Sequence, residues 1–546
     1  KSGNGTLLLN AQNHYQGETR INLGTIQLGA SAPTQNALFY RFTEASTSNT
    51  AASTLRADNF IVQAGATFDL NGKNQSVGSI AASNSLPGAG GIITNTAIGG
   101  AVNFHSLTTA ALTFSGSLAG NLNFLKSGGN TTTLTDNHSH TGTTTLFGGL
   151  TILQDQARFS GGNTVTVNRS VLRWDDTGLQ ALNNRFTEGA LAVTNANSSD
   201  IVLNGGALQF NSRSGFQGVA TFGDLTLESG ASLVAASIGL TGTTQGIGSA
   251  TMSFGSLSRS TTNATISFHG LSGIVGQNPY VKFATAPTLN NGIIGAWATV
   301  IGTNPSYVGS AANAQAGIQA SFATYDPVNG IMPLSASQYD FFFAPNTLIS
   351  GVSTLALTGI GSAPTANVRI QNDQLTTGTA LTANLPSGGA TINTLTLGGH
   401  DAQLTIGFQS GSDLLTLSAG GVLAAATDNV QRNIGTLTTR GRITSGIGQL
   451  FVHNVENRLV INSEITGTLD LIMTGLNRAD LIPEITLDNA NTYVGTAYAN
   501  GIIVNLGNPD LAVPTATTNA ITGDLVISGG TNVVADSALH TAPLVR

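Results

Sequence analysis

Short stretches of alternating apolar and polar residues, each closed by a turn that contains glycine, recur along the whole chain. Typical examples are IVLNGGALQF (Ile201 to Phe210), LTLESGASLV (Leu225 to Val234) and LTLSAGGVLA (Leu415 to Ala424). A period of two in Leu, Ile and Val predicts a strand with one buried face, and Gly or Asn between two such stretches predicts a turn. Helical periodicity is almost nowhere to be found. The pattern therefore predicts an all-β protein.

An internal repeat indicates how these strands assemble. Residues 1–30 return without a gap as residues 126–155, and a more diverged copy covers 485–507, where ITLDNANTYVG matches LLLNAQNHYQG of the first copy. Repeats of this kind predict a fold that stacks similar units, each touching its neighbours. Nine of the thirty positions are identical between the first two copies, namely Lys1, Ser2, Gly3, Thr6, Leu9, Gly17, Thr19, Gly24 and Leu28 against Lys126, Ser127, Gly128, Thr131, Leu134, Gly142, Thr144, Gly149 and Leu153.

Two β architectures are compatible with this strand–turn–strand pattern: an antiparallel sandwich or barrel, and a right-handed parallel β-helix. The ungapped copy favours the β-helix, in which coils stack about 4.8 Å apart and like residues form ladders. Coils of roughly 20 to 25 residues would give a solenoid on the order of 100 Å long. We expect β-helix repeats over 1–277, an aromatic-rich spacer or loop insertion over 278–345, and β-helix repeats again over 346–546.

Composition excludes several classes of protein. Only 9% of the 546 residues are charged while 40% are hydrophobic, a balance that argues against disorder. A net charge of −7 without a basic stripe argues against a nucleic-acid partner. Cysteine is absent, so disulfides and zinc–thiolate sites are excluded. Apolar runs such as Gly420 to Ala426 fall far short of the roughly 20 residues of a membrane-spanning helix.

The two ends of the chain resemble neither a leader nor a closing motif. Lys1 stands inside a repeat rather than in a charged region followed by an apolar stretch, and the chain stops at HTAPLVR. We expect a section of a longer chain, with any signal peptide, anchor and export module outside it.

The first repeat, from Lys1 to Gly29, resembles the autotransporter-associated β-strand repeat of bacterial passenger regions and large surface proteins. It follows that family's pattern "K-S-G-x-G-T-L-x-L-x-x-x-N-x-Y-x-G-x-T-x-I" at almost every fixed position. The second copy departs from it with Thr132 and Thr133 for the paired leucines and His140 for the tyrosine. The resemblance implies an exported β-helix at the bacterial cell surface or secreted from it. It implies no single activity and no cofactor.

Parallel β-helices also house polysaccharide lyases and glycosidases, which need clustered carboxylates. Asp and Asn commonly cap turns through their own backbone, and we expect that role for the acidic candidates here. His138 and His140 share one strand face and would permit a metal, but their place in the repeat favours a solvent-facing position. We therefore assign no catalytic, cofactor or metal residue. The acidic candidates are Asp175, Asp176, Asp401 beside His400, Asp413, Glu484 and Asp488.

Aromatic residues gather between Tyr280 and Phe343, which carry ten of the chain's 32 aromatic residues. Rings that stack on sugars or on other proteins would make this segment a contact platform. The alternative is that the rings cover a flank of the β-helix or form the core of an insertion. The candidate contact residues for a partner or a glycan are Trp297, Tyr307, Phe322 and Tyr325.

These observations together predict a non-enzymatic, extracellular structural rod without a cofactor. Because the open end of a β-helix leaves strands unpaired, we expect self-association into fibres or a surface coat. The alternatives are an adhesin that binds glycans or host and matrix surfaces and, third, a polysaccharide-active enzyme. The enzyme would require carboxylates that converge on one face of the β-helix.

Overall fold

The computed structural model divides the chain into two compact units, which are described separately. The first unit comprises 1–228, 233–260 and 278–286, and the second comprises 229–232, 261–277 and 287–546. The structure describes residues 1–15, 17–32, 34, 36–38, 59–183, 185–186, 195, 198–239, 247–271, 273, 275–302, 320–343, 353–372, 380–399, 402–425, 431–455, 458–475, 483–507, 520–528 and 532–535.

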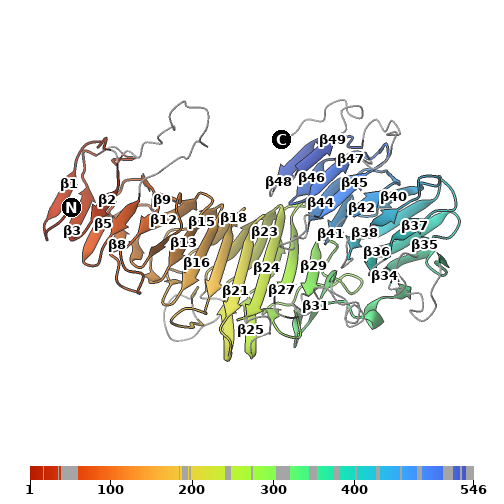
Figure 1. Cartoon of the computed structure of the whole chain (residues 1–546), viewed down its shortest axis with the longest axis horizontal. Helices are drawn as coiled ribbons and strands as arrows, with labels where there is room; N and C mark the ends of the chain where they lie inside the picture. Colours follow the sequence, from red (N-terminus) through yellow and green to blue (C-terminus); the bar gives the residue numbers. More distant parts are fainter. Residues whose placement is uncertain are drawn as a thin grey trace. The chain divides into compact units, whose positions relative to one another are not determined.

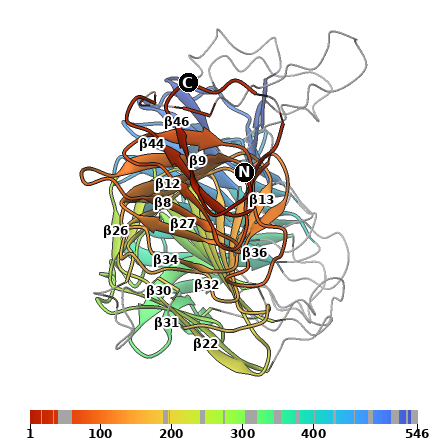
Figure 2. The same cartoon turned by 90° about the vertical axis from the view of Figure 1, so that its left-hand side faces the viewer.

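Strands of the first unit stack as successive coils, side by side in Figure 1 and one behind another in Figure 2. The shorter sheets follow the orders β1-β3-β5-β8-β11, β2-β4-β7, β22-β25-β28 and β14-β17. Their strands are β1 (Thr6–Leu9), β2 (Thr19–Ile21), β3 (Gly24–Leu28), β4 (Phe60–Val62), β5 (Ala66–Asp69), β7 (Ile80–Ala81), β8 (Ile92–Asn95), β11 (Ser117–Gly120), β14 (Asn137–His138), β17 (Arg158–Phe159), β22 (Phe216–Thr221), β25 (Gly248–Phe254) and β28 (Tyr280–Phe283).

Two longer stacks in this unit follow the orders β6-β9-β12-β15-β18-β20-β23-β26 and β10-β13-β16-β19-β21-β24. Their strands are β6 (Gln75–Val77), β9 (Val102–Leu107), β10 (Leu112–Phe114), β12 (Leu122–Ser127), β13 (Thr131–Leu134), β15 (Thr144–Phe147), β16 (Leu150–Gln154), β18 (Val165–Asn168), β19 (Val171–Asp175), β20 (Ile201–Asn204), β21 (Ala207–Ser212), β23 (Leu225–Ser229), β24 (Ala231–Ile238) and β26 (Leu257–Arg259).

Like positions of successive coils face each other in parallel register. Phe114, Leu134, Leu153, Trp174 and Phe210 form one such ladder across β10, β13, β16, β19 and β21. All five side chains are fully buried. Burial of a large apolar side chain contributes about 1.5–3 kcal/mol, so the ladders account for much of the stability of the stack. The predicted parallel β-helix is confirmed.

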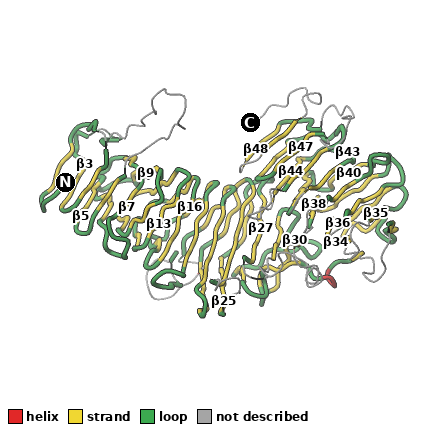
Figure 3. Tube along the Cα trace, in the orientation of Figure 1, coloured by secondary structure: helices red, strands yellow, loops and turns green. Residues whose placement is uncertain are grey.

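In the second unit, β27 (Thr265–Gly270) pairs in parallel with β29 (Ala298–Gly302), but the next pairs are antiparallel. β30 (Ala320–Asp326) pairs antiparallel with β29, and β31 (Gly330–Pro333) pairs antiparallel with β30. The antiparallel pair occupies the edge of β29 that a further parallel coil would use, and covering an edge limits unwanted strand addition. A single 3-10 helix, Ala336–Gln338, follows in the part of the chain that the structure describes (Figure 3).

A second β-helix follows from 341 onward, with two stacks ordered β32-β34-β36-β38-β41-β44-β46-β48 and β33-β35-β37-β39-β42-β45-β47-β49. In addition, β40 pairs with β38, and β43 pairs with β40. Its strands are β32 (Phe341–Phe343), β33 (Thr354–Ala356), β34 (Ser362–Asn372), β35 (Leu381–Asn384), β36 (Gly389–Gly399), β37 (Leu404–Gly407), β38 (Leu414–Ala424), β39 (Arg432–Ile434), β40 (Arg442–Ser445), β41 (Gln449–Asn454), β42 (Arg458–Ile461), β43 (Glu464–Ile465), β44 (Asp470–Gly475), β45 (Glu484–Leu487), β46 (Ala497–Asn500), β47 (Ile503–Leu506), β48 (Leu525–Ser528) and β49 (Asn532–Ala535).

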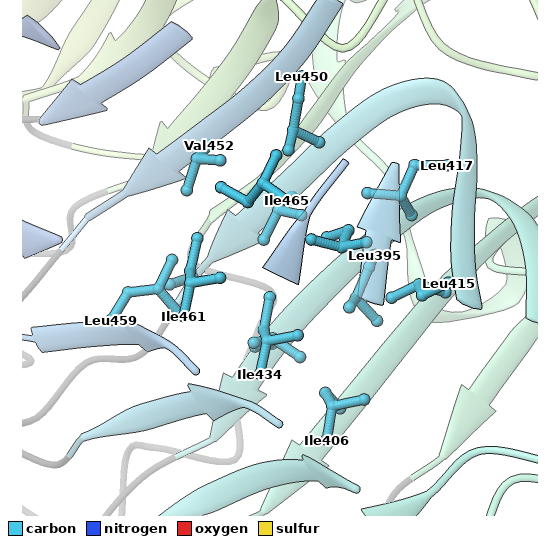
Figure 4. Close-up of a cluster of buried hydrophobic side chains, with 14 of the residues drawn as sticks. Leu395, Ile406, Leu415, Leu417, Ile434, Leu450, Val452, Leu459, Ile461 and Ile465 are labelled. Carbon is cyan, nitrogen blue, oxygen red and sulfur yellow. The ribbon is translucent and has the colours of Figure 1, made fainter. Parts of the chain in front are cut away.

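Two hydrophobic clusters stabilise the second unit. The inner cluster fills the β-helix with ladders of Leu, Ile and Val, of which Ile406, Ile434 and Ile461 are drawn in Figure 4. The outer cluster lies between the antiparallel segment and the outward face of β38, β41 and β44. It consists of Ile293, Ala296, Ile301, Ala320, Phe322, Leu334, Tyr339, Leu423, Ala425, Phe451, Val455 and Ile472.

Candidate functional site

The structure places the predicted contact residues in different environments. Phe322 is fully buried in the outer cluster and has no surface to offer a ligand. Trp297 and Tyr325 are half-buried. Tyr307 lies outside the described residues. Of the four, Trp297 and Tyr325 therefore keep aromatic surface.

Close packing explains why Phe322 is inside. A Cβ atom built at Gly421 of β38 would lie 2.8 Å from the Phe322 Cζ atom and 2.9 Å from the Ala296 Cβ atom. Since real Cβ atoms do not approach other atoms this closely, glycine at 421 is what lets the ring lie against the strand. Phe322 thus fits the alternative given for this aromatic segment, in which the rings form the core of an insertion.

Polar contacts also tie this segment to the outward face of the second β-helix. His453 Nε2 lies 2.8 Å from the Ala296 carbonyl oxygen, and Arg369 Nη1 donates to the Ala320 carbonyl oxygen at 3.0 Å. His453 is fully buried, and burial lowers its pKa to about 4. A neutral imidazole and a guanidinium thus satisfy carbonyl groups that the cover would otherwise bury without partners.

Tyr498 is a surface aromatic that the sequence reasoning missed. It lies on β46, opposite Ile472 of β44, and both Tyr498 and Trp297 pack half-buried against the outer cluster. Burial, and to a smaller extent the Asp470 carboxylate, raises the pKa of the Tyr498 hydroxyl. The residue lies far outside the aromatic-rich stretch, and the available signal was its outward place in the alternation of AYAN. Trp297 and Tyr498 are called the aromatic rim below.

The acidic candidates are engaged in structural contacts. Asp413 accepts hydrogen bonds of 2.9 Å from the backbone N–H groups of Gly388, Gln409 and Ser410, which is the expected turn role. Asp175 likewise accepts from the Thr177 N–H at 2.9 Å.

The remaining carboxylates form ion pairs instead. Asp176 pairs with Arg185 at 2.9 Å, Glu484 with Arg458 at 3.1 Å, and Asp488 lies 3.8 Å from Arg440 Nη1. Turn capping alone does not describe these three residues. Asp401 and His400 lie outside the described residues.

His138 and His140 do not face solvent, and that expectation was wrong. Both side chains are fully buried between coils, with ring centroids 5.8 Å from that of Phe159. Imidazole is flat and mostly carbon, so a neutral ring fits an aromatic stack that also includes Phe114 and Phe124. Across the described ranges, no group of three or more His, Asp or Glu side chains could hold a metal ion.

Lysine at the start of the first and second repeat copies binds turn carbonyls. Lys126 is fully buried, and its ammonium donates to the carbonyl oxygens of Gly128, Asn130 and Gly148 at 3.2, 2.9 and 2.8 Å. Lys1 makes the equivalent bonds to the carbonyls of residues 3 and 23. Burial lowers the pKa of the Lys126 ammonium to about 8. The lysine shared by the first two copies therefore connects two successive coils.

The glycine that lies close to each of these two lysines, Gly24 and Gly149, follows from the same geometry. Gly149 has a φ of +61°, and a Cβ atom there would lie 2.6 Å from Lys126 Nζ and from the Gly128 oxygen. Gly24 has a φ of +74° and a similarly close approach to Lys1 Nζ. A side chain at either position would displace the ammonium in a backbone conformation that L-residues rarely adopt.

Replacing Lys126 by methionine is expected to destabilise the first unit by about 1–3 kcal/mol, because three part-buried carbonyl groups lose their donor. Urea unfolding followed by circular dichroism measures the change. Lys73 is the matched control, because its ammonium makes one longer, exposed bond of 3.3 Å to Ala30. Lys73→Met should stay within about 0.5 kcal/mol. Equal effects of the two substitutions would contradict the structural role of Lys126.

Comparisons with known proteins give one curated relative. The Adhesin BmaC autotransporter of Brucella suis biovar 1 (strain 1330) is 31% identical over 204 residues, which make up 35% of this chain and 5% of that protein. The chain thus spans a small part of the relative's length, and it is a distant homologue of an autotransporter adhesin over about a third of its own. No family model and no solved structure matches the chain. None of the described helices has the length and apolar character to span a membrane.

Proposed function

We propose that the chain is part of an exported, surface-displayed adhesin: a non-enzymatic β-helical passenger that holds contact surfaces away from the cell. The observation that carries this proposal is the similarity to an autotransporter adhesin in a chain that folds as a parallel β-helix. Fold alone does not imply function, so the adhesive role depends on the relative and on the available surface. The acidic side chains engaged in turns and ion pairs give no support to a polysaccharide-active enzyme.

The contact surface proposed for this role lies on the second unit and consists of the aromatic rim, Trp297 and Tyr498, together with Tyr325. Half-exposed rings suit neutral glycans, because an aromatic ring stacks on the apolar face of a sugar. The low charge of the chain, with 9% charged residues, also favours an uncharged ligand.

Binding of the purified chain to a glycan array and to immobilised matrix protein tests this function. Replacing Trp297 and Tyr325 together by alanine is expected to weaken binding about tenfold or more, since two aromatic contacts together contribute about 1–3 kcal/mol. Phe216→Ala is the matched control, because this exposed ring lies in the first unit and should leave binding unchanged. Unchanged binding by the double variant, or no binding by the parent chain, would contradict the proposal.

A second proposed property is self-association of the rod end to end. The side chain of Leu7 in the coil of β1 is 44% exposed, whereas Thr132 at the equivalent repeat position is 2% exposed. Leu7 pairs with the buried Ile26 and therefore lies on the inward side of β1. Another coil stacked on this surface, from a longer chain or from a second copy, would bury it, as β10 does for β13.

Sedimentation velocity across a hundredfold range of concentration, with negative-stain micrographs, tests the self-association. Concentration-dependent growth that is lost in Leu7→Asp would support it. Monomers throughout, without fibres, would contradict it and leave the adhesive function standing.

A further inference from the structure

Two positions of the repeat have the same residues in the first and third copies and different ones in the second. Asparagine occupies the first of them at Asn13 and Asn491, where the second copy has His138. Tyrosine occupies the other at Tyr15 and Tyr493, where the second copy has His140. The second copy thus carries two ionisable rings at positions that hold no basic group in the others.

Asparagine at the first position connects three coils. Asn491 Oδ1 accepts from the Ile465 N–H of the coil before at 2.7 Å, and its Nδ2 donates to the Ala520 carbonyl oxygen of the coil after at 2.6 Å. His138 Nδ1 takes over the first bond, accepting from the Leu118 N–H at 3.1 Å. Its Nε2 atom is buried and has no hydrogen-bond partner within the described residues. Histidine at this position therefore keeps the hydrogen bond to the coil before but not the one to the coil after.

Histidine at the second position keeps the hydrogen bond that the tyrosine makes to the threonine four residues later. The Tyr15 hydroxyl bonds the Thr19 hydroxyl, and His140 Nε2 lies 2.8 Å from the equivalent Thr144 Oγ1. The other ring nitrogen, Nδ1, is buried and also without a partner in the described part of the chain. One proton added to it would be a charge inside an aromatic core.

We propose that the coil around His138 and His140 is an acid-sensitive joint, which is closed while both rings are neutral and opens locally when the solution is acidified. The two rings share a fully buried site between Phe114, Phe124 and Phe159. A single buried cation there is unfavourable, and two cations two residues apart also repel each other.

Charged groups on the surrounding elements offer little compensation. β11, which precedes β14 in the stack, has no titratable side chain, and β17, which follows, contributes Arg158. β12 contributes the Lys126 ammonium, which is bonded to carbonyl groups. The chain before β14 contributes Asp136. The segment after β19 contributes Arg185, whose backbone carbonyl accepts from the Phe159 N–H of β17 and whose guanidinium is already paired with Asp176.

The direction of the pH dependence follows from burial. Burial lowers the pKa of His138 to about 3, helped by repulsion from His140, and it lowers the pKa of His140 to about 4. In an open chain, both imidazole rings have the unperturbed histidine pKa of about 6.5. The stability of the coil is therefore complete above this pH and is lost as the pH falls from 6.5 toward 4, since the open form binds protons that the closed form does not. Each ring raises the open population about tenfold per pH unit in this range.

Hydrogen exchange of the full chain, resolved by peptide and corrected for intrinsic rates, tests the joint at pH 7.0 and pH 4.5. The matched variant is His138→Asn/His140→Tyr, which restores the residues of the first and third copies. Protection of peptides within 114–160 is expected to fall at least about 100-fold more in the parent chain than in the variant. Peptides from 201–229, which contain no histidine, should respond alike in both.

The proposal is overturned if protection of these peptides falls less than tenfold in the parent chain between pH 7.0 and pH 4.5. It is also overturned if protection falls as much in the variant as in the parent. Should the double variant fail to fold, the parent chain labelled with ¹³C-histidine decides the outcome by NMR. Ring titration midpoints below pH 5.5 for both residues, assigned from single substitutions, support the joint. Midpoints at or above pH 5.5 overturn it.

Discussion

Replacing Asp176 by alanine should destabilise the first unit by about 3–5 kcal/mol, the largest effect expected of a single substitution there. Asp176 and Arg185 are both fully buried, and the carboxylate accepts from Arg185 Nη2 at 2.9 Å and from Trp174 Nε1 at 2.8 Å. The substitution leaves the guanidinium in the core with its bond to the Ala157 carbonyl, 5.7 Å from the Trp174 ring. Urea unfolding monitored by tryptophan fluorescence measures the loss.

Two controls separate burial from charge pairing as such. Glu18 and Arg20 form an exposed ion pair of 2.8 Å in the same unit, and Glu18→Ala should cost less than about 1 kcal/mol. Replacing both buried partners, as in Asp176→Leu/Arg185→Met, should recover most of the loss, because two apolar side chains leave no charge unpaired. A loss below about 1 kcal/mol for Asp176→Ala would show that water reaches the guanidinium.

Replacing Phe322 by alanine should destabilise the second unit by about 3–5 kcal/mol. The ring fills the outer cluster, to which Phe451 and Leu423 also belong, and the glycine at 421 leaves a flat backbone surface that cannot collapse into the cavity. The substitution would then leave a void between the antiparallel segment and the outward face of the β-helix. Calorimetry, with the calorimetric and van't Hoff enthalpies compared, measures the change in unfolding.

Phe342→Ala is the matched control for this substitution, since Phe342 is 38% exposed on β32 of the same unit. Its removal should cost less than about 1 kcal/mol, because most of the lost contact is with water. Comparable losses for the two rings would place Phe322 at the surface, where the aromatic platform first proposed from the sequence would have it.

Alternation and repetition predicted the fold because both describe local geometry. Leu415 and Leu417 lie two residues apart in the sequence and both point into the inner cluster, as the period of a strand requires. Register followed from the repeat, because like residues stack above like residues in a parallel coil. The division into two units had no such signal.

Position of the polar residues was harder to predict. Alternation puts His138 and His140 on one face but does not say which face, and their polarity favoured solvent. Their aromatic neighbours come from coils before and after, and local sequence does not show that stack.

The sequence does contain a signal that the outward face of the second β-helix is covered. The runs LFV (Leu450 to Val452) and LIM (Leu471 to Met473) are apolar at consecutive positions, so both faces of β41 and β44 should be buried. The covering strand β30 lies more than a hundred residues earlier in the chain. Nothing in either segment encodes that pairing, which depends on the complementary shapes of Phe322 and the glycine at 421.

Ladders such as Phe114, Leu134 and Leu153 have a consequence for how this protein changes over time. Each strand takes its register from the coil before it and offers the same register to the coil after it. The free energy of the stack is then a sum of nearest-neighbour terms, so the losses from Asp176→Ala and Phe322→Ala should add. A coil with compatible faces fits at many places in such a stack. Recombination can therefore lengthen or shorten the stack in steps of whole coils, while an individual copy diverges, as at His138 and His140, without redesign of the others.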